Sequence, residues 1–372
     1  MMAQTEFADN TNQTVNYINI DTAKARSFCE LLFRAYGFSI EESKIISDVI
    51  IKADLYGIES HGVQRLIRYH DEITSGQVDV SARTQIVHET QISACIEANK
   101  RMGQLAGVEA MKLAIQKAKT SGCGMVTIRN SNHYGIARYY TEMASAHDLI
   151  GVSMTNTEAI CVPTFGSQAM TGTNALALAM PASPFIFSYD ASTTVVPRGT
   201  LEVYRKTGTP LPDNWALDAE GKPCNDAATV IDSIIAKTGG GIAPLGGLGI
   251  LNGGHKGYGL GVIVDLFSAV ISGGLTSNHV NRKPGHTGIC HYFMAIDYGI
   301  FGEKNLIKEN MSKFLQELRD SKKAEGCKRI YTHGEKETEL LNTRIKGHIP
   351  VNEKTYAEMK MIAEKLGVDF QL

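Results

Sequence analysis

Three short turns of the chain place a histidine or a lysine among glycines and small polar residues. They lie at residues 60–62 (SHG), 130–135 (NSNHYG) and 253–261 (GGHKGYGLG). Imidazole transfers protons near neutral pH, and a basic side chain close to the free N–H groups of a helix start binds anions. These turns are therefore the first candidates for a site that combines proton transfer with anion binding.

The first turn combines a base with an anion ligand. Ser60 is predicted to be the N-cap of a helix that ends near Gly76, so that His61 takes the first helical position and Arg65 lies one turn further on the same face. The positive end of a helix disfavours imidazolium and lowers the pKa of His61, while Arg65 can bind a carboxylate with two hydrogen bonds. The alternative is that His61 only helps to cap the helix.

The second and third turns offer similar groups. His133 is predicted to follow a strand and precede a helix, although asparagine-rich turns also form because asparagine tolerates unusual backbone angles. Lys256 is predicted at the start of a helix, where its charge opposes the helix dipole unless an anion such as a cofactor phosphate lies in the glycine-rich turn. A lysine solvated at a surface turn is the alternative.

Two further polar loops, at residues 155–157 and 190–194, follow predicted strands and suit either a ribose and a nicotinamide or plain turns. The chain has no G-x-G-x-x-G and no G-x-x-x-x-G-K-[ST], which argues against a standard Rossmann domain or P-loop. It also lacks H-E-x-x-H and paired cysteines, and His286 and His291 lie in a stretch that alternates like a strand, so no metal site is expected.

The elements that must hold these turns are of mixed type. Helical periodicity covers residues 22–38 and 39–57, with a capping box at Ser39 and Glu42, and strands and helices then mix without strict alternation. The apolar stretch 257–274 contains Asp265 and glycines and is interpreted as a buried helix. We expect a helix-rich discontinuous domain from residues 1–76 and 240–372, and a mixed α/β domain from residues 77–239.

The bulk composition limits the classes of partner. A formal charge of −2 and a charged fraction of 20% give no reason to expect nucleic acid or an anionic membrane surface as a partner. The seven cysteines are scattered without close pairs, which indicates reduced thiols. The first residues have no apolar core and no early basic residue, so we expect a cytoplasmic protein.

Taken in order, the stretches ESHGVQRL, NSNHYG, TNTEAICVPTFG, GTNALALAMP, WALDAEGKP and GGHKGYGL resemble the type-2 malate/L-lactate dehydrogenase family. The resemblance extends from about residue 20 to residue 350. It implies an α/β mixed (α+β) fold, with a non-Rossmann cofactor domain built on a largely antiparallel sheet, and a homodimer. It also implies hydride transfer between NAD, or possibly NADP, and a 2-hydroxy or 2-oxo acid.

The resemblance also assigns roles to individual residues. His61 would be the acid/base, with His133 as the competing candidate, and Ser60 and Arg65 would bind the substrate. The implied cofactor-binding residues are Asn156, Thr157, Asp190, Ala191, Ser192, Thr193, Lys256, His333, Gly334 and Glu335. Malate is the expected substrate, and lactate, ureidoglycolate, a sugar acid or a cyclic imino acid are the alternatives within the family. A ligand-binding protein without catalysis is the alternative from another class.

Overall fold

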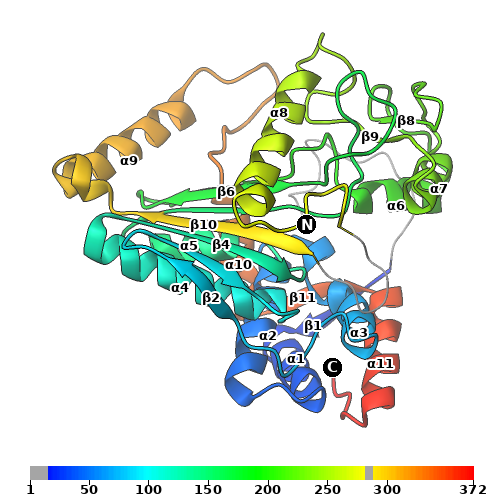
Figure 1. Cartoon of the computed structure of the whole chain (residues 1–372), viewed down its shortest axis with the longest axis horizontal. Helices are drawn as coiled ribbons and strands as arrows, with labels where there is room; N and C mark the ends of the chain where they lie inside the picture. Colours follow the sequence, from blue (N-terminus) through cyan, green and yellow to red (C-terminus); the bar gives the residue numbers. More distant parts are fainter. Residues whose placement is uncertain (1–15, 281–287) are drawn as a thin grey trace.

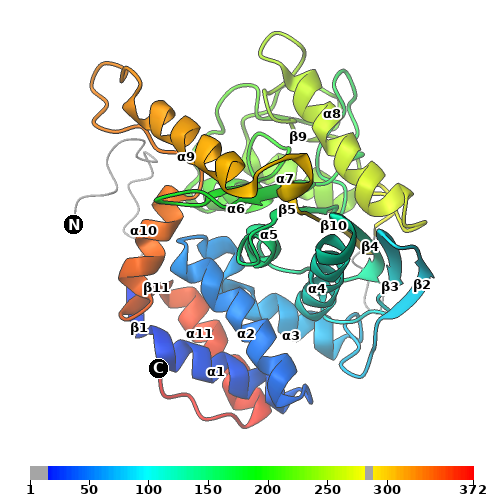
Figure 2. The same ribbon diagram turned by 90° about the vertical axis from the view of Figure 1, so that its left-hand side faces the viewer.

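The structure, a computed structural model, describes residues 16–280 and 288–372 and consists of a helical layer packed beneath a large sheet (Figures 1 and 2). Strand β1 (Tyr17–Asp21) pairs antiparallel with β11 (His348–Asn352), so the two ends of the described chain meet in the helical layer. The helices of this layer are α1 (Thr22–Ala35), α2 (Ile40–Leu55), α3 (Leu66–Thr74), α10 (Glu335–Arg344) and α11 (Glu353–Leu366).

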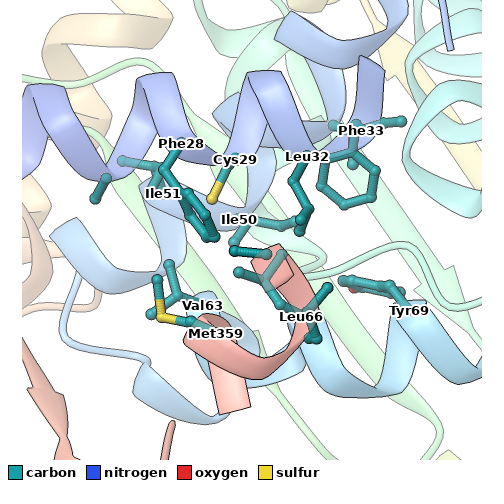
Figure 3. Packing of buried hydrophobic residues seen from close by; sticks show 14 of the residues in the cluster. Phe28, Cys29, Leu32, Phe33, Ile50, Ile51, Val63, Leu66, Tyr69 and Met359 are labelled. Atoms are coloured by element: carbon teal, nitrogen blue, oxygen red, sulfur yellow. The ribbon is translucent and has the colours of Figure 1, made fainter. Parts of the chain in front are cut away.

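The helical layer is held by an apolar core to which α1, α2, α3 and α11 contribute (Figure 3). Leu32 and Phe33 of α1 pack with Ile50 of α2, Leu66 of α3 and Met359 of α11, and all five are buried. Full burial of each such side chain stabilises the fold by about 1.5–3 kcal/mol. This core fixes α3, and with it the segment that joins α2 to α3.

The start and end of α2 follow the sequence pattern. Ser39 Oγ accepts a hydrogen bond from Glu42 N, and Glu42 Oε2 accepts one from Ser39 N, which confirms the predicted capping box. Gly57 adopts a φ of +78° just after the helix, a conformation that favours glycine. The chain can therefore turn sharply between α2 and the SHG segment.

The large sheet has seven strands in the order β2-β3-β4-β10-β5-β6-β7. Only β3 and β4 pair in parallel, and all other neighbours in this sheet are antiparallel. The strands are β2 (Gln85–Glu89), β3 (Ser93–Glu97), β4 (Cys123–Ser131), β5 (Ile150–Thr155), β6 (Ala175–Met180), β7 (Phe187–Ala191) and β10 (Ile289–Ile296). The predicted mixed α/β fold with a largely antiparallel, non-Rossmann sheet is thereby confirmed.

The domain division expected from the sequence remains a prediction. Strand β10 belongs to the part assigned to the helix-rich domain, yet it lies at the centre of the sheet between β4 and β5. The C-terminal part of the chain therefore contributes to both layers. Helix α9 (Lys304–Asp320) then leads from the sheet towards α10.

Helices α4 (Gly103–Ser121) and α5 (Arg138–Ser145) lie between the sheet and the helical layer (Figure 2). Arg101, which is buried, joins the layers because its guanidinium bonds Glu42 of α2 at 3.0 Å and Glu109 of α4 at 2.8 Å. Its Nη1 also donates to Ala82 O at 2.6 Å. Removal of one partner from such a buried pair destabilises a protein strongly, so this contact fixes how the layers meet.

A third group of elements lies on the other side of the sheet (Figure 1). Helices α6 (Arg198–Thr207) and α7 (Ala227–Ala236) pack on the short pair β8 (Ala216–Leu217) and β9 (Gly241–Ile242) around a small apolar core. Beside them runs α8 (Gly254–Asp265), which continues as a π-helix, η3 (Leu266–Val270).

The interpretation of residues 257–274 as a buried helix is wrong. Asp265 and several glycines face inward, whereas the large apolar side chains lie outward and are 43–55% exposed, namely Val262, Ile263, Leu266, Val270 and Ile271. No helix within residues 16–280 and 288–372 is both long and apolar enough to cross a membrane.

Candidate active site

The SHG segment is not the start of a helix. Glu59–His61 and Val63–Arg65 form two short 3₁₀ turns before α3, and the side chain of Ser60 caps neither turn. The predicted N-cap at Ser60 and the first helical position of His61 are therefore wrong, because Gly62 takes a non-helical conformation (φ −85°, ψ −147°). Ser60 Oγ instead lies 2.9 Å from His61 Nδ1, so the hydroxyl orients the imidazole.

Gly62 is required by a buried carboxyl group. Asp54, at the end of α2, is buried, and its Oδ2 accepts a hydrogen bond from Val63 N at 2.8 Å. A Cβ atom on Gly62 would lie 1.8 Å from Asp54 Oδ1. Burial raises the pKa of Asp54 to about 8, so its carboxyl is largely protonated at neutral pH. Asp54 thus connects the stable helix α2 to the turn that carries His61.

The NSNHYG turn lies against the SHG turn. It joins β4 to α5, and the buried side chain of Asn132 fixes it by donating to Lys100 O and Arg101 O. The rings of His61 and His133 stack with their centroids 5.5 Å apart. Tyr69 of α3 lies 2.8 Å from His133 Nδ1 through its hydroxyl oxygen. The structure therefore brings together two histidines that are 72 positions apart in the chain.

The surroundings of His61 keep its imidazole neutral. Burial, followed by the charges of Arg65 and Arg68, lowers the pKa of His61 to about 3. The direction agrees with the sequence-based expectation, but the cause is burial and neighbouring guanidinium groups rather than a helix dipole. His61 is therefore unprotonated at neutral pH, which is the form that a general base needs.

Arg65 lies beside this imidazole pair without a carboxylate of its own. Its Nε donates to Ser60 O, and among residues 16–280 and 288–372 it forms no salt bridge. Burial and the nearby charge of Arg68 lower the pKa of Arg65. A partly desolvated guanidinium without a counter-ion is a ready ligand for an anion.

His291 supports the same site and was missed by sequence reasoning. It lies fully buried on β10, and its ring stacks on Tyr134 at 4.3 Å. Because a carbonyl oxygen only accepts, His291 Nε2–H donates to Asn132 O at 3.2 Å, which leaves Nδ1 to accept from the Thr155 hydroxyl at 2.8 Å. His291 therefore ties the His133 turn to the end of β5.

His291 and Tyr69 could have been found only in part. The alternating pattern around His291 placed it on a strand, but the neighbouring strand cannot be read from the sequence. Tyr69 follows Arg65 by four residues, and this helical spacing was a usable signal. His286 lies outside the described residues, and no group of three potential metal ligands occurs among the residues that the structure describes.

The predicted cofactor residues near α8 differ in how many hydrogen bonds their side chains make within the protein. The amide of Asn156 is committed to the fold, since it donates to Asp265 Oδ1 and Leu275 O and accepts from Cys290 N. Thr157 Oγ1 accepts from Thr173 N at 3.0 Å, and Thr193 Oγ1 donates to Thr173 O at 3.2 Å. Ser192 lies beside Thr194, to whose carbonyl its hydroxyl donates at 3.4 Å.

The remaining predicted cofactor residues lie around β7. Asp190 Oδ2 accepts from Arg138 N at the start of α5, and burial raises the pKa of Asp190 to about 6. Ala191 ends β7. His333 O accepts from Ser188 N, Gly334 is the N-cap of α10, and the carboxylate of Glu335 is held by Arg319, Arg329 and Thr332. Asp190 and Glu335 thus hold elements in place.

Lys256 lies in the first turn of α8, as predicted. The N-cap is Gly253, with a φ of +87° and no side-chain cap. A Cβ atom on Gly254 would lie 1.9 Å from Gly247 O and 2.7 Å from Gly249 O, so only glycine fits there. Gly249 and Leu248 also line an open cavity of about 220 Å³, together with residues 162–166. This helix start combines uncapped N–H groups, a lysine and an adjacent cavity.

Comparison with known proteins identifies the class of enzyme to which this fold and these residues belong. The family model described as malate/L-lactate dehydrogenase matches residues 20–360. The chain belongs to this family and is an oxidoreductase of the dehydrogenase type.

The relatives specify the resemblance further. The chain is 43% identical over 354 residues to a malate dehydrogenase of Pyrococcus abyssi, covering 95% of this chain and 96% of that protein. It is 32% identical over 353 residues to a malate/(S)-sulfolactate dehydrogenase of Methanothermus fervidus, covering 94% and 98%. The crystal structure of malate dehydrogenase from Entamoeba histolytica superimposes with a TM-score of 0.92 at 32% identity, covering 96% and 100%.

The contact between Asp54 and Gly62 predicts a clear stability effect. Gly62→Ala should lower the free energy of unfolding by about 1–3 kcal/mol, because the new Cβ forces the buried carboxyl of Asp54 to move. Urea unfolding followed by circular dichroism measures this. Gly199→Ala, with no atom near the added Cβ, is the matched control and should leave stability unchanged or raise it by up to about 1 kcal/mol, because Gly199 lies in helix α6. Equal effects would contradict the role of Asp54.

His291 predicts a pH dependence of stability. Burial lowers its pKa to about 3 in the folded chain, below the ordinary 6.5, so its contribution is fully present above pH 6.5 and is lost as the pH falls towards 3. Between pH 7.5 and 5.5 the wild type should lose about 1.4 kcal/mol more than His291→Gln in urea unfolding. Parallel losses in the two proteins would show that His291 is not buried in the neutral form.

Proposed function

We propose that the protein is an NAD(P)-dependent dehydrogenase that interconverts a 2-hydroxy acid and a 2-oxo acid, with malate and oxaloacetate as the pair. The observation that carries the proposal is the stacked pair of His61 and His133 beside Arg65, whose guanidinium has no ion-pair partner among the described residues. The pair can move a proton at the hydroxyl-bearing carbon while the arginine holds the adjacent carboxylate.

In this proposal His61 is the acid/base. Its Nδ1 is held by the Ser60 hydroxyl, which leaves Nε2 for the substrate. Burial and two guanidinium groups keep it neutral, as a base that removes the hydroxyl proton must be. A bound acid would offset the charges of Arg65 and Arg68 and raise the pKa of His61, so that the same group can return the proton in the reverse reaction. His133, held by Tyr69, is the competing candidate.

Arg65 and Ser60 are proposed to bind the substrate. Arg65 donates through Nε to Ser60 O, so its terminal nitrogens are the ones available to a carboxylate. This arrangement would align the hydroxyl group of the substrate with the neighbouring imidazole. Alignment of reacting groups is a large part of most rate accelerations.

The cofactor is proposed to be NAD, with NADP as the alternative. The start of α8 fits the phosphates of a dinucleotide, because its N–H groups have no side-chain cap and Lys256 stands in the first turn. When bound, the nicotinamide supplies or accepts the hydride. Thr157, Ala191, Ser192, Thr193, His333 and Gly334 are proposed as contacts, while Asn156, Asp190 and Glu335 are proposed to shape the binding region through the hydrogen bonds described above.

The alternatives within the family are lactate, ureidoglycolate, a sugar acid or a cyclic imino acid. Malate is favoured because relatives named malate dehydrogenase are 42–43% identical to this chain, whereas relatives named ureidoglycolate dehydrogenase are 28% identical. A steady-state panel of oxaloacetate, pyruvate and a cyclic imine, each with NADH and NADPH, tests the proposal. If none of these compounds causes the absorbance of NADH or NADPH to fall, the alternative of a non-catalytic binding protein is favoured.

The assignment of His61 predicts a specific loss. His61→Asn should lower the turnover number with oxaloacetate about 10²–10⁴-fold, because the proton donor is removed while the shape is nearly kept. His133→Asn should have a smaller effect on turnover, and His88→Asn, an exposed residue on the edge strand β2, is the matched control. Parent turnover in His61→Asn together with a large loss in His133→Asn would assign the proton transfer to His133.

We also propose that the protein works as a homodimer through the outward face of α8 and η3. Five large aliphatic side chains lie exposed along this continuous helical surface, and apolar patches of this kind mark protein interfaces. Because Lys256 lies in the first turn of the same helix, the interface would lie beside the proposed cofactor region.

The dimer proposal predicts the effect of one charge. Ile263→Glu should convert a dimer into a monomer in light scattering, since a buried carboxylate without a partner is costly at an interface. Ile235→Glu, at an isoleucine on α7 that is 59% exposed against 43% for Ile263, is the control and should leave the mass unchanged. A monomeric wild type, or a dimer that survives Ile263→Glu, would contradict the proposal.

The proposed location is the cytoplasm. All seven cysteines have free thiols, as a reducing compartment allows.

A further inference from the structure

Arg68, on the first turn of α3, has a buried nitrogen without a partner. Its Nε donates to Glu72 Oε1 at 2.6 Å, but its Nη2 is buried and has no hydrogen-bond partner among residues 16–280 and 288–372. Glu72 Oε2 is likewise buried and has no partner in the described part of the chain, so Glu72 satisfies only part of the guanidinium. The side chain of Arg68 is 15% exposed. A buried donor without a partner needs an explanation, and a bound ligand is one such explanation.

This guanidinium lies next to the site described above. Arg68 and Tyr69 follow Arg65 by three and four residues, and Glu72 follows Arg68 by four, which places these side chains along one face. Tyr69 contacts His133 from that face. The charge of Arg68 also lowers the pKa of both His61 and Arg65, as only a close neighbour can. Arg68 therefore belongs to the helix face from which Tyr69 contacts the imidazole pair.

We propose that Arg68 binds the second acidic group of the substrate and thereby selects 2-oxo acids that carry a carboxylate or a sulfonate on C3. This inference rests on the proposed function, in which Arg65 holds the carboxylate next to the reacting carbon. Neither the sequence motifs nor the relatives' names assign a role to Arg68.

The hydrogen-bond donors around Arg68 support a substrate with two acidic groups. Two guanidinium groups belong to this part of the chain, and the only carboxylate among residues 16–280 and 288–372 that is bonded to either is that of Glu72. One anion at Arg65 leaves Nη2 of Arg68 unsatisfied, whereas a second acidic group would satisfy it. Sites built to bind a polar group reject analogues that lack it, because their own buried donors then remain unpaired.

Glu72 acts in this scheme as a positioning residue. Its bond to Nε of Arg68 spans one helical turn and holds the planar guanidinium in one orientation. Because Nε is bonded to Glu72, the two terminal nitrogens of Arg68 are held in a fixed orientation for binding an anion. A lysine at this position has no such planar edge, so it can retain the charge without the geometry.

The test compares wild type and Arg68→Gln with oxaloacetate, sulfopyruvate and pyruvate. In the wild type, kcat/KM should be higher for one or both of the first two than for pyruvate, and Arg68→Gln should lower that ratio about 10- to 100-fold. The loss should be larger for the doubly acidic substrates than for pyruvate, and it should appear mainly in their KM. Comparison of oxaloacetate with sulfopyruvate separates a carboxylate from a sulfonate as the preferred group.

Two controls make the result specific. Arg205→Gln removes an exposed arginine that pairs with Asp232 and should leave the substrate ratio unchanged. Arg68→Lys keeps the positive charge and should give an intermediate ratio, so it serves if Arg68→Gln folds poorly. A wild-type ratio in both Arg68 variants would overturn the inference.

Failure of the inference can be distinguished from failure of the proposed function. If the wild type reduces 2-oxo acids and the ratio does not depend on Arg68, the function stands and the role of Arg68 is wrong. If the wild type reduces none of them, the proposed function is wrong. In that case thermal unfolding with L-malate or L-lactate still tests Arg68, since stabilisation by malate should exceed that by lactate in the wild type and become equal in Arg68→Gln. Equal stabilisation in the wild type would overturn the inference.

Discussion

The candidate site depends on the docking of the helical layer onto α4 and α5. His61, Arg65 and Tyr69 come from the helical layer, whereas His133 comes from the turn that follows β4. The buried guanidinium of Arg101 connects the layers through Glu42 and Glu109. A charge buried in this way tolerates only one geometry, because any separation of the layers leaves it without a partner. The stacking of the two imidazoles is thus a consequence of how the layers are joined.

Within each layer, the functional side chains are held by residues that do no chemistry. Asp54 fixes the turn of His61 through Val63 N, and His291 fixes the turn of His133 through Asn132 O. Both groups are buried and uncharged in the folded chain near neutral pH, since burial raises the pKa of one and lowers that of the other. The pair of turns is therefore supported by neutral hydrogen bonds that salt does not screen.

The sequence predicted the general type of the fold and the turns that carry the histidines, but not how they meet. The spacing of SHG and NSNHYG marked His61 and His133 because glycine and short polar residues around an imidazole are informative locally. The helix predicted from Ser60 was wrong, since the interaction of Gly62 with Asp54 depends on the packing of α2. His291 and Arg68 were missed for the same reason: their importance comes from partners on other elements or from an unsatisfied atom, and periodicity reveals neither. The exposed apolar face of α8 was likewise not predicted, because the spacing of apolar residues along the helix does not show which side packs against the rest of the protein.

The pairing of β1 with β11 has a consequence for how the chain acquires its structure. Every strand of the large sheet lies between residues 85 and 296, so the sheet has all its strands before residues 297–372 are synthesised. Helices α1 and α2 acquire their partners later. The strand that precedes them pairs with residues 348–352, and α11 completes their apolar core. Contacts between residues this far apart in the chain form late, because closing so large a loop costs entropy before the free energy of the contacts offsets that cost. The layer that carries Arg65 and Arg68 is therefore the last part of the molecule to be completed on the ribosome.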